Sequence, residues 1–255
     1  MLIFTHLLIQ NSFILNSSFL ILSFKIQNSS MRYERKFVVD SLSKYQVESM
    51  VLVHKALFRP IHKPRQINNI YFDTHNFTFY SDNVIGKSSR KKVRIRWYGE
   101  TFALAEKPVL EYKLKTGAVG SKLSFKLKPF NPAEKITAES LRNLIAESEV
   151  PDWVKEEFKY LEPKLINSYT RKYFLTDNTK FRLTLDSNLT YINIGKYGVS
   201  FSEKQIDNYN LVVELKYDIE ADEYANAIGS GFAFRLSKSS KYVNGIECFN
   251  KYLTV

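Results

Sequence analysis

The sequence has one cysteine, few glycines and prolines, and no long uninterrupted apolar run. Cys248 is the only cysteine, so the chain can form neither an internal disulfide nor a cysteine-based metal site, which fits a reducing, cytoplasmic setting. Nine glycines and seven prolines in 255 residues leave no segment rich enough in either residue to separate two domains. Because 44% of the residues are hydrophobic, we expect one large domain with a substantial core.

Residues 1–30 differ in composition from the rest of the chain. No lysine or arginine precedes Lys25, whereas a secretory signal carries positive charge before its apolar run. Asparagines and serines interrupt the apolar residues, whereas a membrane span needs about twenty apolar residues in succession. The composition favours translation from Met31, with residues 1–30 a misassigned extension without a structural role. A weak N-terminal membrane anchor is the alternative.

Acidic residues are fewer than basic ones, and the formal net charge is +11. A chain this basic is expected to bind polyanions, which include nucleic acids, phosphorylated small molecules and anionic membrane surfaces. Tyrosine and phenylalanine are abundant, but they fall mostly on the apolar faces of predicted strands. They therefore predict core packing rather than base stacking, and we expect no nucleic-acid partner.

Alternating and helical patterns predict an α+β fold dominated by antiparallel strands. Strands are expected at residues 32–39, 67–74, 92–99, 109–117, 121–130, 167–176, 181–189 and 210–218. Helices are expected within residues 41–58, 136–149, 151–161 and 222–229. Ser43 and Gln46 have the spacing of a capping box, and Pro151 suits a first helical turn.

The strand containing "KKVRIRWYG" has one entirely cationic face. Lys92, Arg94 and Arg96 point to one side, because side chains alternate along a strand, and three apolar residues point to the other. At least five predicted strands repeat this division. A solvated outer face is one explanation, but the many arginines favour bidentate contacts to phosphate. We therefore predict a closed antiparallel barrel that encloses a cationic tunnel, with helices packed outside.

The segments "ERKF", "VRIRWYG", "LEYKLKTG", "SYTRKYF", "VELKY" and "SKSSKY" occur in this order between Met31 and Val255. In this order they resemble the vacuolar transporter chaperone (VTC) domain of the triphosphate tunnel metalloenzyme, or CYTH-like, superfamily. The resemblance implies that residues 31–255 form a triphosphate tunnel domain. It further implies an ATP-dependent polyphosphate polymerase that uses Mn²⁺ or Mg²⁺ and has ATP, triphosphate and inorganic polyphosphate as ligands.

The same resemblance assigns the site residues. The residues expected to act on the phosphates are Lys36, Arg94, Arg96, Lys113, Arg171 and Lys241. Further substrate contacts are expected from Arg182, Lys238 and Ser240, and metal binding from Glu214, with Glu34 or Glu111 as second contributors. The superfamily begins with Glu-x-Glu-x-Lys, but Arg32 stands at the first position here. This loss of a carboxylate favours a single-metal polymerase over two-metal hydrolysis.

Other residue types offer little catalytic chemistry. The segment "GKSSRKK" lacks the glycine spacing of a Walker loop, so its bases are expected at the tunnel mouth. His54, His62 and His75 are scattered, and Cys248 is expected to be a packed apolar residue. Two alternatives stay open: a tripolyphosphatase or nucleoside triphosphatase of the same superfamily, and a non-catalytic polyanion-binding module. A cytoplasmic location is expected, and membrane association through a separate partner is left open.

Overall fold

The computed structural model describes residues 32–117, 119–134, 136–250 and 253, so the predictions for residues 1–30 lie outside the described residues. The strands are β1 (Arg32–Val39), β2 (Arg59–Asp73), β3 (Ser89–Tyr98), β4 (Val109–Thr116), β5 (Val119–Lys126), β6 (Glu162–Leu175), β7 (Phe181–Gly195), β8 (Gly198–Asp207) and β9 (Leu211–Asp218). The helices are α2 (Lys44–Leu52), α3 (Thr78–Val84), α4 (Ala138–Glu147), α5 (Asp152–Phe158), α6 (Asp222–Ser230) and α7 (Lys241–Phe249), with a short 3-10 turn η1 (Ile219–Ala221) before α6.

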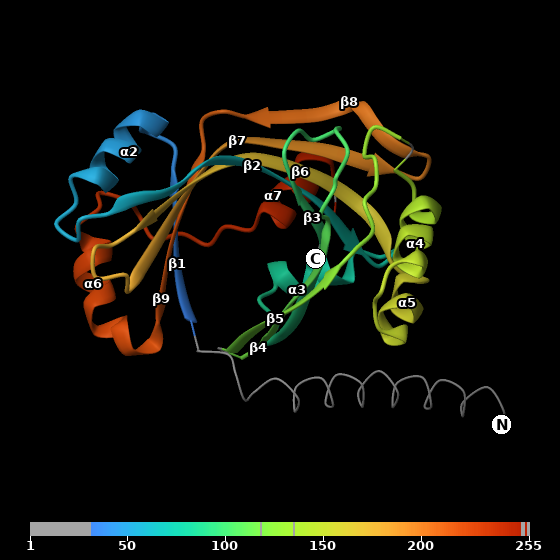
Figure 1. The fold of residues 1–255 in the computed structure, drawn as a ribbon, viewed down its shortest axis with the longest axis horizontal. Coiled ribbons are helices and arrows are strands. Elements are labelled where there is room, and N and C mark those ends of the chain that lie inside the picture. The colour runs from blue at the N-terminus through green and yellow to red at the C-terminus, as the bar shows by residue number, and fades with distance from the viewer. Residues whose placement is uncertain (1–31, 118, 135, 251–252, 254–255) are drawn as a thin grey trace. The chain divides into compact units, whose positions relative to one another are not determined.

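The strands form one antiparallel, strongly curved sheet (Figure 1). Its order is β1-β9-β7-β6-β2-β3-β4-β5, and β8 pairs with β7 beside this path. Five adjacent pairs are consecutive in the sequence: β2 with β3, β3 with β4, β4 with β5, β6 with β7, and β7 with β8. The predicted α+β class with antiparallel strands is therefore confirmed.

Closure of the sheet into the predicted barrel is not detected among the described residues. No strand pairing joins β1 to β5 among the described residues. Part of the free edge of β1 is used by the segment before α7, because Phe37 bridges to Leu236 and the Ser237 amide donates to the Lys36 carbonyl at 2.8 Å. At Lys36 and Phe37 this edge of β1 is therefore not available to pair with β5.

Four helices cover the convex side of the sheet, as expected. Val47 and Val51 of α2 and Ala225 of α6 pack with Leu183 and Val213 in one apolar core. On the other half of the sheet, Phe158 of α5 meets Phe72 edge-on at 4.9 Å, and α4 packs beside α5. Along the strands these apolar residues alternate with polar residues that face the concave side. One sheet can therefore have an apolar convex face and a polar concave face.

Helices α3 and α7 depart from the prediction, because they lie on the concave side (Figure 1). Tyr242 of α7 stacks on Tyr71 of β2 at 5.2 Å, and Tyr71 is the cross-strand partner of Arg94, so all three share one side of the sheet. Gly245 permits this close packing, since a Cβ there would be 2.3 Å from Leu165 Cδ2. One part of the concave face is therefore an apolar core, and charge gathers in the rest.

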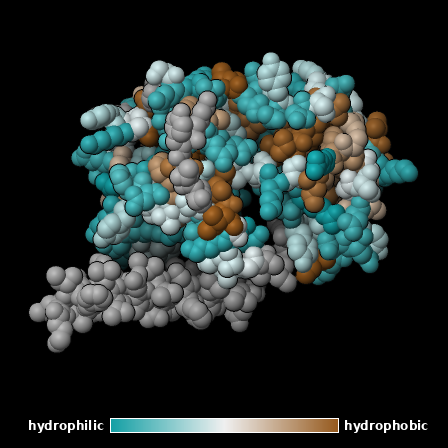
Figure 2. Space-filling model, turned by 180° about the vertical axis from the view of Figure 1, so that it is seen from behind, coloured by the Kyte–Doolittle hydropathy of each residue, from teal (hydrophilic) through white to brown (hydrophobic). Residues whose placement is uncertain are grey.

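The surface seen from behind is mainly hydrophilic, carries hydrophobic side chains in small groups, and is hollowed near its centre (Figure 2). None of the helices formed by the described residues is both long enough and apolar enough to cross a membrane.

Candidate functional site

A cavity of about 220 Å³ lies on the concave side of the sheet. It is lined by Lys36, Tyr71, Lys92, Arg94, Arg96, Glu111, Lys113, Lys122, Tyr169, Arg171, Glu214, Lys216, Ser239, Ser240 and Lys241. Nine of these side chains are basic and two are acidic. The lining comes from β1, β2, β3, β4, β5, β6, β9 and the start of α7, so segments distant in the sequence converge here. We call this cavity the cationic cavity.

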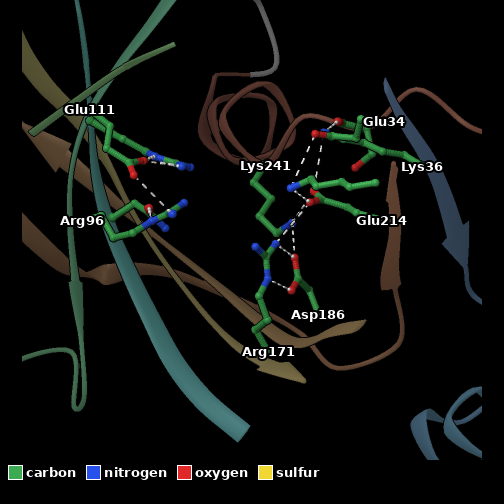
Figure 3. A network of polar contacts seen from close by, with 12 residues as sticks. Glu34, Lys36, Arg96, Glu111, Arg171, Asp186, Glu214 and Lys241 are labelled. Atoms are coloured by element: carbon green, nitrogen blue, oxygen red, sulfur yellow. Dashed lines mark hydrogen bonds and ion pairs between the residues drawn. The ribbon is translucent and has the colours of Figure 1, made fainter. Parts of the chain in front are cut away.

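One wall of the cationic cavity is organised around Glu111 of β4 (Figure 3). Cross-strand register places Arg94 opposite Glu111, and the guanidinium donates to one carboxylate oxygen at 2.6 and 2.8 Å. Arg96 and Lys122 approach the other oxygen at 3.5 and 3.3 Å. Burial alone would raise the pKa of Glu111, but these three cations outweigh it and lower the pKa to about 2.

The opposite wall is organised around Glu214 of β9 (Figure 3). Its carboxylate lies 3.1 Å from Lys216 Nζ and 3.4 Å from the Arg171 guanidinium. Lys36 and Lys241 lie 3.6 and 3.8 Å away. Burial opposes ionisation of Glu214, yet the four cations hold its pKa well below the usual range. Glu214 is therefore ionised at neutral pH and reduces the repulsion among these bases.

Asp186 of β7 belongs to the same wall, although the sequence did not identify it as a site residue. Its side chain is fully buried, and Arg171 donates to its two oxygens at 2.5 and 2.6 Å. Lys241 Nζ lies 2.6 Å from the same carboxylate. Asp186 therefore fixes the direction in which both cations point, since a bidentate pair constrains orientation as well as distance.

Lys92 and Lys113 have no carboxylate within ion-pair distance among the described residues. Lys92 donates to Ser240 Oγ at 2.8 Å. Burial, together with the charges of Lys36 and Arg94, lowers the pKa of Lys92 to about 7. The charge of Arg94 is the main cause that lowers the pKa of Lys113. The positive charges of these two lysines are therefore not paired with a carboxylate, which is typical of a site that binds an anion.

Two tyrosines complete the cationic cavity. Arg94 donates to the Tyr71 hydroxyl at 3.3 Å. The cations of Arg171 and Lys241 lie over the Tyr169 ring, 5.3 and 4.7 Å from its centre. Both rings hold neighbouring cations in place through hydrogen bonding and cation–π attraction.

A larger cavity of about 550 Å³ also contacts Tyr169, but it lacks this concentration of charge. Its lining contains one base, Lys204, and one acid, Glu100, among mostly neutral side chains. The smaller, cationic cavity is therefore the candidate site for a polyanion.

The structure brings together most of the residues that the sequence selected. Lys36, Arg94, Arg96, Lys113, Arg171, Ser240 and Lys241 line the cationic cavity, with Glu111 and Glu214. Arg182 and Lys238 are exposed and do not line it. Sequence reasoning did not select Lys92, Lys122, Lys216, Ser239 or Asp186, although strand alternation places Lys92 with Arg94 and Lys216 with Glu214.

The remaining expectations concern histidine and cysteine. His54 is buried and stacks on Phe232 at 4.4 Å, which is a structural role, and no histidine of the described chain lines the cationic cavity. Cys248 was expected to be packed, but it is exposed on α7, because Tyr242, Gly245 and Ile246 form the buried face of that helix.

The described residues contain no group of three or more acidic, histidine or cysteine side chains arranged to hold a metal ion. Two carboxylates nevertheless suit a metal that takes its other ligands from phosphates, as Mg²⁺ usually does. Glu34 and Glu214 share two lysine neighbours: Lys36 lies 2.8 and 3.6 Å from them, and Lys216 lies 3.6 and 3.1 Å. Glu111 belongs to the opposite wall, away from these two carboxylates. Glu34 and Glu214 are therefore the pair of carboxylates that could hold one such metal together with phosphate oxygens.

One solved structure has a similar fold by TM-score. A putative adenylate cyclase from Vibrio parahaemolyticus is 13% identical and has a TM-score of 0.50, and the likeness covers 85% of this chain and 99% of that one. A putative adenylyl cyclase from Hippeastrum, described as having a dominant triphosphatase activity, is 16% identical with a TM-score of 0.46, over 83% of this chain and 93% of that one. At such identities the likeness to the Vibrio protein concerns the fold alone.

Sequence comparison gives the family. Subunit 2 of the vacuolar transporter chaperone complex of Saccharomyces cerevisiae is 27% identical over 154 residues. The match covers 49% of this chain and 18% of the yeast protein, so this chain matches less than a fifth of that relative's length. The VTC domain matches residues 31–250, which include every helix and strand described above. The chain therefore belongs to the VTC domain family.

Proposed function

We propose that this protein is a divalent-metal-dependent polyphosphate polymerase, which transfers the γ-phosphate of ATP to the end of a growing polyphosphate chain. One observation carries the proposal: nine basic side chains converge on one cavity whose lining holds only two carboxylates. So many cations lining one cavity repel one another, and a linear polyanion relieves that repulsion. Membership of the VTC domain family supports the same ligand class.

The two walls of the cationic cavity have the chemistry that phosphoryl transfer requires. Little covalent work falls to the protein in this reaction, since it must align donor and acceptor and neutralise charge on the transferred group. Arg94, Arg96 and Arg171 would grip non-bridging oxygens in pairs, because guanidinium groups match phosphate geometry. Lys36, Lys113 and Lys241 would act as point charges along the chain.

A metal held by Glu34 and Glu214 would supply charge neutralisation at the phosphate oxygens. Lys36 and Lys216 already contact both carboxylates, so these lysines would position the acids and also face the bound phosphates. Glu214 is the proposed main ligand because it is the more buried of the two, with 8% of its side chain exposed against 31% for Glu34.

The proposed acceptor needs no general base. A terminal phosphate of polyphosphate is an anionic oxygen at neutral pH, so no proton has to be removed before it attacks. This agrees with a lining that, in the part of the chain described, holds neither histidine nor cysteine.

The test incubates the full-length protein with ATP and Mn²⁺ and examines the products on a gel that resolves polyphosphate. Long polyphosphate supports the proposal. Release of free phosphate without chain growth would instead identify a tripolyphosphatase or nucleoside triphosphatase. Metal-dependent binding of tripolyphosphate without turnover would identify a binding module.

Two variants make this test specific to the cationic cavity. Arg94→Ala/Arg96→Ala removes two lining arginines and should abolish chain growth. Arg182→Ala is the matched control, because it removes an arginine that is exposed and outside the lining. Equal products from wild type and the double variant would refute the assignment of these arginines. Excess duplex DNA should not compete with ATP in any of these reactions.

The yeast relative is a subunit of a complex, which supports the expectation that partner chains exist for this protein too. We propose that any transfer of product across a membrane depends on such a separate partner.

A further inference from the structure

We propose that Asp73 is a positioning residue for the cationic cavity: its hydrogen bond to Tyr242 fixes the first turn of α7 and thereby the placement of Lys241. Neither Asp73 nor Tyr242 lines the cavity. The effect on ligand binding rests on the proposed function, whereas the effect on Lys241 itself does not.

Asp73 is the last residue of β2, and its side chain is completely buried. One carboxylate oxygen accepts from the amides of Thr74 and Phe79 at 2.7 and 2.8 Å. The other accepts from the Tyr80 amide at 2.8 Å and from the Tyr242 hydroxyl at 2.5 Å. Three of these donors lie within α3 or just before it, so Asp73 ties the end of β2 to α3 and α7 together.

Tyr242 carries this connection to the cationic cavity. Its side chain is buried and stacks on Tyr71 at 5.2 Å, and the Tyr71 hydroxyl accepts from Arg94. Burial and the Asp73 carboxylate raise the pKa of Tyr242 well above its ordinary value, so the phenol remains a donor. Lys241 directly precedes Tyr242 in α7. Its ammonium group lies 2.6 Å from the Asp186 carboxylate, which belongs to the wall organised around Glu214.

Two further contacts to the residues at the start of α7 come from cations that line the cavity. Lys92 donates to Ser240 Oγ at 2.8 Å, and Lys36 donates to the Ser239 carbonyl at 3.3 Å. Both ammonium groups line the cavity, and a bound polyanion would compete for them. The Tyr242–Asp73 hydrogen bond lies outside the lining, so it persists when the ligand draws the lysines away.

The first experiment needs no ligand. Tyr242→Phe removes only the hydroxyl and keeps the stacked ring, and the rate at which an amine-reactive reagent labels Lys241 is then measured by peptide mass spectrometry. Lys241 is protected in the native protein, with 8% of its side chain exposed. We expect labelling about fivefold faster in Tyr242→Phe, the factor that follows from losing one net hydrogen bond. Exposed Lys159 is the internal reference.

Tyr80→Phe is the matched control. Tyr80 is buried in the same apolar cluster, and its hydroxyl donates only to Glu247, at 3.4 Å. Its removal should leave Lys241 labelling unchanged, while thermal unfolding shows that both variants fold. Equal labelling of Lys241 in Tyr242→Phe and wild type would overturn the inference, whatever the protein binds.

The second experiment uses a double-mutant cycle to test whether the Tyr242–Asp73 hydrogen bond affects ligand binding through Lys241. Tyr242→Phe should weaken tripolyphosphate binding about fivefold in the wild-type background and by less than about twofold in Lys241→Met, because the two residues act through one group. An equal loss in both backgrounds would show a merely structural role and refute the positioning role. If wild type does not bind tripolyphosphate at all, the proposed function fails, and the labelling experiment still decides the inference.

Discussion

Arg171 and Asp186 face each other across β6 and β7, and the guanidinium of Arg171 donates to both oxygens of a carboxylate that no solvent reaches. Lys241 reaches the same carboxylate from α7. Asp186 is thus an internal counterion for two of the cations proposed to hold phosphate. Removing the negative charge of Asp186 would test how much unpaired positive charge in the cavity the fold can tolerate.

We expect Asp186→Asn to lower the free energy of unfolding by about 3–5 kcal/mol, because it leaves buried cations without their partner. Tripolyphosphate should recover part of this loss, since it supplies the missing negative charge. Denaturant unfolding with and without tripolyphosphate measures both effects. Unchanged stability in the absence of ligand would contradict this account of Asp186.

Two arginines on neighbouring strands should differ in their effect on binding. Arg171→Gln is expected to weaken tripolyphosphate affinity at least about tenfold, because it removes charged hydrogen bonds in an enclosed site. Arg182→Gln should change it by less than about twofold, because Arg182 is exposed and outside the lining. Titration calorimetry measures the tripolyphosphate affinity of both variants. Similar losses in the two variants would mean that net charge alone governs binding.

Lys92 predicts a pH dependence of binding. Its pKa is about 7 in the free protein, so above pH 7 it is largely neutral, whereas a bound polyanion favours the charged form. Binding should therefore take up a proton, and affinity should fall as the pH rises through and above 7. Calorimetry in two buffers of different ionisation enthalpy measures the uptake.

Lys92→Met should reduce this uptake without abolishing it, since the pKa of Lys113 is lowered too. The effect of Lys92 on folding stability has the opposite dependence on pH. An unfolded Lys92 titrates near 10.5, so between about 7 and 10.5 the unfolded chain binds more protons than the native one, and this lysine makes stability rise with pH. If binding took up as many protons in Lys92→Met as in wild type, the assignment of this uptake to Lys92 would be contradicted.

Gly245 and Gly229 form a matched pair for helix packing. In Gly245→Ala the new methyl would meet Leu165 and Tyr191 at 2.3 and 2.7 Å, and overpacking of this kind costs about 1–3 kcal/mol. In Gly229→Ala the nearest atom is 3.7 Å away, so the better helix propensity should raise stability by about 0.5–1 kcal/mol. Thermal unfolding distinguishes the two signs. A stabilised Gly245→Ala would show that α7 shifts freely on the sheet.

Much of the fold follows from local patterns. Period-two alternation located β1, β3 and β9 and assigned their faces correctly: Val93, Ile95 and Trp97 are buried opposite the basic residues. The capping box predicted at Ser43 and Gln46 is present at the start of α2. Pro151 is the N-cap of α5 rather than a residue of its first turn. Such features depend on neighbours in sequence, which is why sequence reveals them.

Elements whose stability comes from distant contacts were missed. The helix α7 contains Gly245, which disfavours a helix locally but fits the close approach to Leu165. The N-cap residue of α3, Phe77, offers no side-chain hydrogen bond, and the first amides of this helix donate instead to Thr74 and Asp73, which precede it. The strand β8 was not predicted, because its sequence "GVSFSEKQID" lacks a sustained apolar alternation.

The same distinction applies to the site. Alternation showed that Lys92 and Lys216 share faces with selected residues, but only strand pairing reveals that these faces meet. The burial of Asp186 depends on both β6 and α7, so no local signal identifies it. Whether the sheet closes depends on what occupies the free edge of β1, and Leu236 lies 199 positions along the chain from its partner there, Phe37.

The open seam between β1 and β5 affects how the cationic cavity can respond to its contents. Its two walls are joined around the curve of the sheet and, through α7, by the side-chain contacts of Lys92 and Lys36. Spreading these walls breaks no backbone ladder. A cavity built in this way can widen while its strand pairing stays intact, whereas a closed barrel could widen only by breaking hydrogen bonds between its strands.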